Sequence, residues 1–155
     1  MKIVVSIPHQ ILRLSDDGDR IVREYPCSTS RFGIGTEPGS NRTPTGRFHI
    51  ARKIGQGAES GTIFKSRIPV GVWRGEPSAE DFVLTRILWL DGLDPDNANT
   101  MDRYIYIHGT NQESLIGTPA SQGCVRLSNA DVIDLFDRVP EGTAVEITGG
   151  DKVPH

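Results

Sequence analysis

The chain contains few cysteines and few aromatic residues: two of its 155 residues are Cys, and 6% are Phe, Trp or Tyr. Two cysteines are too few for a disulfide scaffold, and Cys27 and Cys124 lie in different sequence contexts. No apolar run approaches the roughly 18 residues that a membrane-spanning helix needs, so we expect no membrane insertion. With 36% hydrophobic and 24% charged residues, the composition predicts a single folded domain over residues 1–155.

An excess of basic charge is also missing. There are 17 Lys and Arg against 20 Asp and Glu, a net charge of −3, and no basic run exceeds two residues. A nucleic-acid surface needs a basic face, so we expect no nucleic-acid partner. The chain has no Cys-x-x-Cys or His-x-x-x-His pair, and Asp91, Asp94 and Asp96 do not have the spacing of a calcium loop. We therefore expect no metal ion and no cofactor.

The N-terminal segment bears on localisation. Met1–Ile7 has one basic residue and a short apolar stretch that Pro8 and His9 interrupt. A secretory signal needs an apolar stretch of roughly 7–15 residues. If Met1 is the native start, we expect a cytoplasmic protein. If a signal segment has been removed ahead of Met1, the alternative is the periplasm or cell envelope.

Short Val-, Ile- and Leu-rich segments separated by turn residues predict a mainly β domain. Asp16-Asp17-Gly18-Asp19 is typical of a hairpin turn. Residues 28–45 form a long Gly-, Ser- and Thr-rich connection, which either serves the site or merely wraps the sheet. The expected strands are 2–7, 10–14, 21–25, 47–51, 62–68, 84–90, 104–107 and 144–148.

One helix is clearly indicated. Ser128 fits an N-cap, and Asp131 is favourable in the first turn. Val132, Leu135, Phe136 and Val139 follow at helical spacing, and Pro140 ends the pattern. We therefore predict a helix directly after the loop that holds Cys124.

The most informative pair is His108 and Cys124, sixteen positions apart. His108 is expected at the end of strand 104–107, whereas Cys124 lies in a polar loop. A thiol needs a nearby base to become a thiolate at neutral pH, and an imidazole is a suitable one. We predict a cysteine acyl-transfer site with Cys124 as nucleophile and His108 as general base. The competing interpretations are a buried core cysteine and a backbone-bonded histidine, and Cys27 is expected to serve packing alone.

The pattern His108-Gly109-Thr110, a loop and Ser121-Gln122-Gly123-Cys124-Val125-Arg126-Leu127 resembles the signature of the L,D-transpeptidase (YkuD-domain) family of peptidoglycan enzymes. Thr43-Pro44-Thr45-Gly46 resembles the Thr-Pro-x-Gly element of that family, although it is more often a turn than a site. Segments 84–90 and 101–104 are similar to a branch of cytosolic L,D-carboxypeptidases of wall recycling. The resemblance spans about residues 3–147. It implies a YkuD-type β-sandwich or barrel-like domain with one helix after the cysteine loop.

The resemblance also implies roles for the loop around the nucleophile. The Gly109 carbonyl would orient the imidazole of His108. The backbone N–H groups of Gln122, Gly123 and Cys124 would form the oxyanion hole. Ser121 would bond within the loop or to the thiol, or serve only the turn. Gln122 departs from the family, in which many members carry His at this position. This difference leaves open which molecule accepts the acyl group and how fast the reaction runs.

The implied substrate is a peptidoglycan stem tetrapeptide or muropeptide, whose third residue is diaminopimelate or Lys. We expect the protein to act as a monomer. Cys124 would form a thioester there and release D-Ala. Water would then give L,D-carboxypeptidase activity, which we favour, and an amine would give L,D-transpeptidase cross-links or D-amino-acid exchange. A non-catalytic peptidoglycan-binding module is the alternative of another class. The candidate substrate-binding residues are Arg126, which could instead brace the loop, and Arg86, Arg103 and Tyr106.

Overall fold

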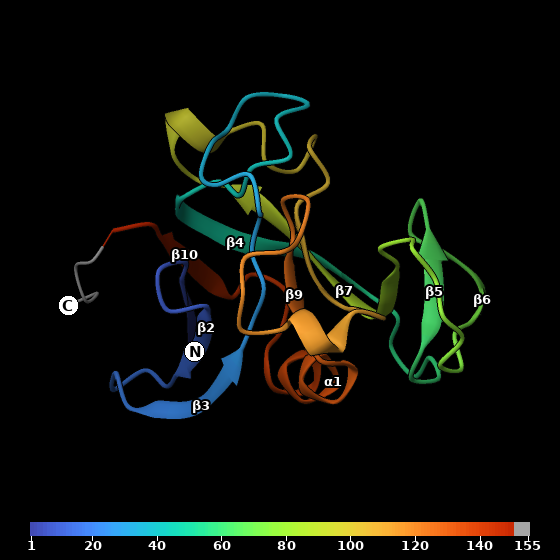
Figure 1. Cartoon of the computed structure of the whole chain (residues 1–155). Helices are drawn as coiled ribbons and strands as arrows, with labels where there is room; N and C mark the ends of the chain where they lie inside the picture. The colour runs from blue at the N-terminus through green and yellow to red at the C-terminus, as the bar shows by residue number, and fades with distance from the viewer. Residues whose placement is uncertain (151–155) are drawn as a thin grey trace.

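The computed structural model describes residues 1–150, so the last five residues of the domain expected over 1–155 lie outside the described range. It shows a mainly β fold with one α-helix among these residues (Figure 1), as the sequence predicts. The strands are β1 (Lys2–Ser6), β2 (Ile11–Ser15), β3 (Ile21–Pro26), β4 (Gly46–Ile54), β5 (Thr62–Lys65), β6 (Ile68–Val72), β7 (Val83–Gly92), β8 (Tyr106–Gly109), β9 (Val125–Leu127) and β10 (Ala144–Thr148). The helix α1 is Asn129–Arg138, and two short 3-10 turns are η1 (Pro95–Asn97) and η2 (Glu113–Leu115).

The strands form one branched sheet in the order β3-β2-β1-β10-β4-β7-β5-β6. Strand β7 pairs with β4, β5 and β8, and β9 joins the sheet through a parallel pairing with β8. The helix α1 packs against β7 and β8 (Figure 1). The fork at β7 therefore supports both the helix and the strand that carries His108.

Alternation along β7 separates two apolar clusters, because successive side chains of a strand point to opposite faces. Leu88 and Leu90 belong to the main core, in which α1 buries its apolar stripe. Ile87 and Trp89 belong to a smaller cluster with Phe64 and Tyr106. Cys124 packs against this smaller cluster. The candidate nucleophile thus lies on the face of β7 opposite the main core.

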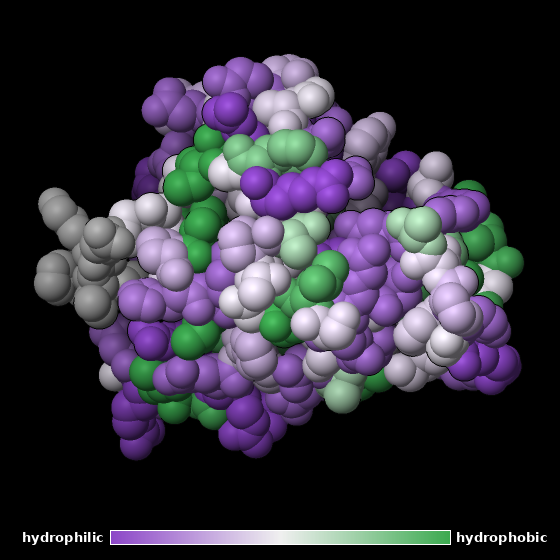
Figure 2. All heavy atoms as spheres, viewed as in Figure 1, coloured by the Kyte–Doolittle hydropathy of each residue, from purple (hydrophilic) through white to green (hydrophobic). Residues whose placement is uncertain are grey.

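The single strand expected over 62–68 is wrong: the chain forms a hairpin here. Strands β5 and β6 pair antiparallel around a turn in which Ser66 and Arg67 have φ of 49° and 65°. Two residues with positive φ make the turn type that matches strand twist, although Gly or Asn usually fills it. The apolar side chains Ile68 and Val70 are 62% and 56% exposed and lie on β6 (Figure 2 shows apolar spheres at this edge).

The strand expected over 104–107 is shifted by two residues. Tyr104 has φ of 57° and is 53% exposed, and the strand runs from Tyr106 to Gly109, so His108 lies inside it. A strand that was not predicted, β9, separates Cys124 from the helix. The expected order of loop, cysteine and helix is therefore corrected to loop, cysteine, short strand and helix.

Other local predictions are confirmed. The Ser128 side chain accepts a hydrogen bond from the Asp131 N–H at 3.1 Å and caps α1, whose buried residues include Val132, Leu135 and Phe136. Asp16 closes the β2–β3 turn by accepting from the N–H groups of Gly18 and Arg20. Cys27 is fully buried in the main core, and burial raises the pKa of its thiol to about 12.

Within residues 1–150, no helix has the length and apolarity to cross a membrane.

Candidate active site

The Cys124 thiol lies at the edge of the smaller apolar cluster, where backbone groups of Tyr104 and Tyr106 contact it. The Tyr106 backbone N–H donates to Sγ at 3.3 Å, and Sγ–H donates to the Tyr104 carbonyl at 3.4 Å. Burial raises the pKa of this thiol to about 11, and the Tyr106 N–H opposes the shift because it stabilises the thiolate. The resting group at neutral pH is therefore the thiol.

The His108 side chain is 3% exposed and lies in β8 opposite Arg126 of β9. Burial lowers its pKa from the ordinary value, and the hydrogen bond with the Gly109 carbonyl opposes this shift. The Nδ1 atom is 2.5 Å from that carbonyl oxygen. A neutral imidazole bonded in this way carries its proton on Nδ1, which leaves Nε2 as a proton acceptor.

Cys124 and His108 lie on the same face of the β8–β9 pair. The parallel register joins Ile107 to Val125 and His108 to Arg126, so Cys124 comes two positions before the residue opposite His108. At about 3.3 Å per residue, the two positions are offset by roughly 6.6 Å along the strands. Among residues 1–150 the thiol bonds with the Tyr104 carbonyl and the Tyr106 N–H, and no hydrogen bond joins it to the imidazole. Proton transfer to His108 therefore requires rotation of the thiol.

The loop before Cys124 is fixed by side-chain hydroxyl groups. The Ser121 hydroxyl donates to the Cys124 carbonyl at 2.6 Å and accepts from the Gly123 N–H at 3.3 Å. Of the alternatives for Ser121, the structure shows the bond within the loop. Thr43 of the Thr-Pro-x-Gly element donates to the Gly123 carbonyl at 2.9 Å. In the described part of the chain, the N–H groups of Gln122 and Cys124 have no acceptor, whereas that of Gly123 is bonded to Ser121.

The long connection over residues 28–45 packs along this loop. Ser121 exchanges backbone hydrogen bonds with it, donating to the Thr29 carbonyl at 2.9 Å and accepting from the Arg31 N–H at 3.0 Å. Ser28 pairs in the same way with Arg126, at 2.9 Å in both directions. The connection therefore holds the cysteine loop rather than merely wrapping the sheet.

The Arg126 side chain makes contacts within the protein that fit a brace of the cysteine loop. Its side chain is fully buried, and its Nη1 donates to Asp81 at 2.9 Å and to Gln112 at 2.7 Å. Its Nη2 donates to the Ser28 hydroxyl at 3.2 Å. The guanidinium thus connects three separate loops, and its residue lies opposite His108 in the β8–β9 pair.

Arg86 is not brought to Cys124. Its Nη1 donates to the carbonyls of Ala58 and Thr85, and its guanidinium lies 5.4 Å from the centre of the Phe136 ring in α1. These contacts place it against the helix, on the other side of β7 from the thiol. The structure therefore gives no support to Arg86 as a substrate contact.

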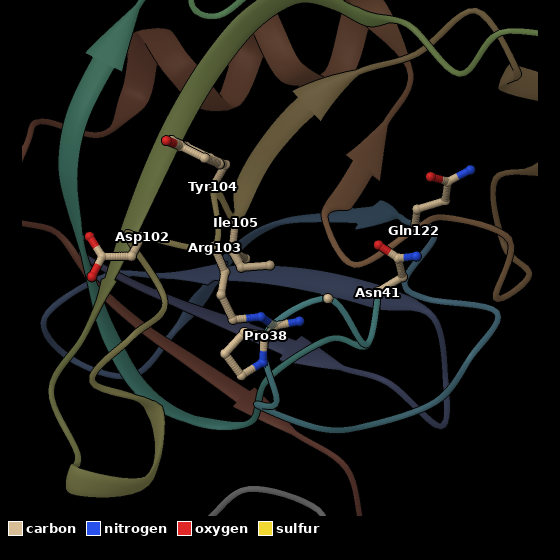
Figure 3. Close-up of a pocket in the computed structure, with 8 residues that line it drawn as sticks. Pro38, Asn41, Asp102, Arg103, Tyr104, Ile105 and Gln122 are labelled. Atoms are coloured by element: carbon tan, nitrogen blue, oxygen red, sulfur yellow. The ribbon is translucent and has the colours of Figure 1, made fainter.

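Arg103 lines a pocket that adjoins the cysteine loop at Gln122. The pocket has a volume of about 290 Å³, and its wall includes Gln122, Tyr104 and Asn41. Figure 3 shows the Arg103 side chain directed toward Pro38, with Asn41 and Gln122 near each other. The Arg103 guanidinium donates to the Arg42 carbonyl at 2.7 Å and to the Gly35 carbonyl at 3.2 Å. Burial lowers its pKa, so this cation is partly desolvated beside an open space.

Several residues of the site were not found from the sequence. Asp81 lies in the connection between β6 and β7, and only the fold brings it to Arg126. The Tyr104 carbonyl is a backbone group, for which the sequence offers no signal. The Thr-Pro-x-Gly motif is a signal for Thr43, but a turn is the commoner role of that motif. Within residues 1–150, no three His, Cys, Asp or Glu side chains gather closely enough to hold a metal ion.

The raised pKa of Cys124 predicts slow alkylation at neutral pH. We expect the rate with iodoacetamide to rise about tenfold per pH unit from about pH 7 to about pH 10, because the thiolate is the reactive form and its fraction grows until the pH reaches the pKa. Mass spectrometry of the labelled chain over a pH series measures the rate. The Cys124→Ala variant, which retains only buried Cys27, should stay unlabelled while folded. A rate that levels off below about pH 8 would contradict a resting thiol and indicate a preformed thiolate–imidazolium pair.

Comparison with known proteins gives the family of this chain. Residues 1–147 match the family described as the L,D-transpeptidase catalytic domain, YkuD. The protein of Bacillus licheniformis named "Putative L,D-transpeptidase YkuD" is 31% identical over 147 residues, which are 95% of this chain and 65% of that protein. Its namesake in Bacillus subtilis is 30% identical over 145 residues, which are 94% of this chain and 64% of that protein. The chain belongs to the L,D-transpeptidase catalytic domain family.

Solved structures of this family share the fold. The structure of LdtMt1 in complex with imipenem has a TM-score of 0.60 at 22% identity, with coverage of 95% of this chain and 58% of that one. The L,D-transpeptidase from Mycobacterium smegmatis has the same TM-score at 19% identity, with coverage of 96% and 58%. The present chain spans about two thirds of the length of the curated relatives named above.

Proposed function

We propose that this domain is a cysteine acyltransferase that acts on peptidoglycan stem tetrapeptides, with Cys124 as nucleophile and His108 as general base. The observation that carries the proposal is the shared face of β8 and β9, on which the thiol is offset by two strand positions from an imidazole whose Nε2 is left as acceptor. Membership of the L,D-transpeptidase family supports the substrate class.

In the first step the thiol proton passes to Nε2 of His108 while Sγ attacks the carbonyl carbon of stem residue 3. The carbonyl oxygen becomes an oxyanion, for which the N–H groups of Gln122 and Cys124 are the available donors. Collapse of this intermediate breaks the amide bond, and the proton on His108 passes to the leaving amine of D-Ala. A thioester on Cys124 remains.

The resting pair starts neutral, because burial raises the pKa of the thiol and lowers that of the imidazole. Charge separation in a buried site is costly without a compensating partner. The reaction is therefore expected to form the thiolate only as it attacks, once the thiol has rotated away from the Tyr104 carbonyl. The free Gln122 and Cys124 N–H groups stabilise the negative charge after it moves to the substrate oxygen.

The pocket beside Arg103 and Gln122 suits the leaving residue. It adjoins the cysteine loop, and its partly desolvated guanidinium favours a carboxylate, which D-Ala carries next to the scissile amide. A departing D-Ala would leave this space to the second reactant. Gln122 lines the same pocket, so its side chain contacts whichever acceptor enters.

We propose water as the principal acceptor, which makes the activity that of an L,D-carboxypeptidase on soluble muropeptides, carried out by a monomer in the cytoplasm. The support is the likeness of segments 84–90 and 101–104 to the cytosolic branch. Water is abundant at the thioester, whereas an amine needs a positioned cleft. The second candidate is transpeptidation, which the names of the relatives favour.

One experiment tests the proposal and separates the two outcomes. The purified protein is incubated with a tetrapeptide muropeptide, and the products are identified by mass spectrometry. A tripeptide product with free D-Ala is the expected result and means that water attacked the thioester. A cross-linked dimer or an exchanged fourth residue would show transpeptidation. Binding without any product would favour a non-catalytic peptidoglycan-binding module and overturn the proposal.

A further inference from the structure

Arg67 stands at the tip of the β5–β6 hairpin and reaches back over the site. Its guanidinium lies 4.8 Å from the ring centre of Trp89 and 5.1 Å from that of Tyr104. Its Nη1 donates to the Tyr106 hydroxyl at 3.2 Å. We call Trp89, Tyr104 and Tyr106 the aromatic platform. Trp89 packs against both tyrosines, with ring centres 5.9 Å and 5.7 Å apart, so the platform is continuous.

The platform holds a cation that has no anionic partner. None of the ion pairs within residues 1–150 includes Arg67, so no carboxylate lies within 4.0 Å of its guanidinium. Aromatic faces attract a guanidinium without neutralising its charge. The planar donor groups of an arginine match a carboxylate in two-point contact. Arg67 therefore presents a positioned positive charge that an anion from outside can complete.

The backbone at this tip is unfavourable for its residue types. Ser66 and Arg67 both have positive φ, a conformation that costs a residue with a side chain about 1–2 kcal/mol and costs glycine nothing. The cation–π contacts offset part of this cost, at about 0.5–2 kcal/mol. The contacts with the platform therefore help to hold this turn and fix the position of the guanidinium.

The place of Arg67 relative to the thiol suggests which anion it meets. Tyr106 spans the gap: its backbone N–H contacts Sγ of Cys124, and its hydroxyl contacts Arg67. The positive charge thus lies one tyrosine side chain away from the reacting atom. In the proposed substrate the D-Ala carboxylate is next to the scissile amide. It is therefore too close to the reacting carbon to reach the Arg67 guanidinium, which lies one tyrosine side chain away. The side-chain carboxylate of diaminopimelate lies at the far end of residue 3 and has the required reach.

We infer that Arg67 binds the side-chain carboxylate of diaminopimelate at stem position 3 and so selects diaminopimelate over Lys, an inference that rests on the proposed function. A Lys residue lacks this carboxylate and would bring only its ammonium group toward the guanidinium. Like charges at this place repel, so the same residue both attracts one substrate and rejects the other. Arg103, which lines the pocket with Gln122, is left to the D-Ala carboxylate.

The test compares two tetrapeptides that differ only in residue 3, diaminopimelate or Lys, on the wild-type protein and on Arg67→Gln. We expect the wild type to prefer the diaminopimelate substrate about 10- to 100-fold in kcat/KM, the range of a hydrogen-bonded charge pair. Arg67→Gln should lose that preference, mainly through KM, with turnover of the Lys substrate unchanged or raised. The matched control is Arg74→Gln, which removes the same charge from an exposed arginine paired with Glu59 after β6 and should keep the preference.

Binding provides a readout independent of turnover. Calorimetric titration of Cys124→Ala with each tetrapeptide should show the same preference, and the double variant Cys124→Ala, Arg67→Gln should lose it. Equal affinity for both peptides, or an equal loss on both in the Arg67 variant, would overturn the role of Arg67 while leaving the proposed function intact. Absence of turnover and of binding with both peptides on the wild type would overturn both.

Discussion

Replacing Cys124 by alanine is expected to abolish tripeptide formation from a tetrapeptide, with the free energy of unfolding changed by no more than about 1 kcal/mol. The thiol is half-buried at the edge of the smaller cluster, and its two hydrogen bonds are weak sulfur contacts to backbone groups. Its removal therefore costs little packing, yet it removes the atom that forms the thioester. The measurements are product formation by mass spectrometry and urea denaturation.

The matched control is Cys27→Ala, which should have the opposite effects. Cys27 is fully buried in the main core and lies outside the site, so truncation leaves a small cavity and lowers the free energy of unfolding by about 1–2 kcal/mol. Turnover by the folded protein should remain close to that of the wild type. Comparable product from the Cys124 variant would eliminate covalent cysteine catalysis. A folded Cys27 variant without activity would contradict its role in packing.

Replacing Arg126 by methionine is expected to lower the free energy of unfolding by about 2–4 kcal/mol. The fully buried guanidinium donates to Asp81, Gln112 and Ser28, and a methionine of similar volume leaves all three acceptors without it. Removal of one partner of a buried ion pair costs about 3–5 kcal/mol. Asp81 is 21% exposed, so water can hydrate its carboxylate in part once the guanidinium is gone. The expected loss of unfolding free energy therefore lies toward the lower end of that range. Urea denaturation followed by circular dichroism measures the change.

The Arg126 variant also separates the brace from a substrate contact. If Arg126 is a brace, the Arg126→Met variant should be less stable, and its KM should change only if the cysteine loop shifts. A substrate contact predicts a raised KM at unchanged stability, a result that would contradict the role assigned here. Arg20→Met is the control, since the exposed Arg20–Asp16 pair at the β2–β3 turn should contribute less than about 1 kcal/mol.

Local sequence patterns predicted the elements whose causes are local. The helix follows from the Ser128 cap and its apolar spacing, and the β2–β3 hairpin follows from its acidic and glycine turn. The mainly β fold follows from short apolar segments. The pairing of Cys124 with His108 was predicted from residue chemistry and family resemblance, and the structure places both on one face, although without a hydrogen bond between them. Their catalytic roles stay predictions.

One missed feature is local, and the others depend on distant parts of the chain. The β5–β6 turn has no glycine, so only the positive φ of Ser66 and Arg67 reveals it. Strand β9 has three residues, too few for a periodic pattern, and exists because β8 offers a partner. The contacts of Arg126 with Asp81 and of Arg67 with the aromatic platform join residues far apart in sequence. Single-chain patterns carry no information about such pairs.

The position of β10 in the sheet has a consequence for biosynthesis. This strand lies between β1 and β4, parallel to β1 with Lys2 opposite Ala144 and antiparallel to β4 with His49 opposite Ala144. The β1–β3 meander, although made first, cannot join the rest of the sheet until residues 144–148 have left the ribosome. Two unpaired strand edges are exposed during that interval, and such edges can pair with other nascent chains. Pairing of β10 with β1 and β4 is thus the event that covers these two edges and ends their exposure to aggregation.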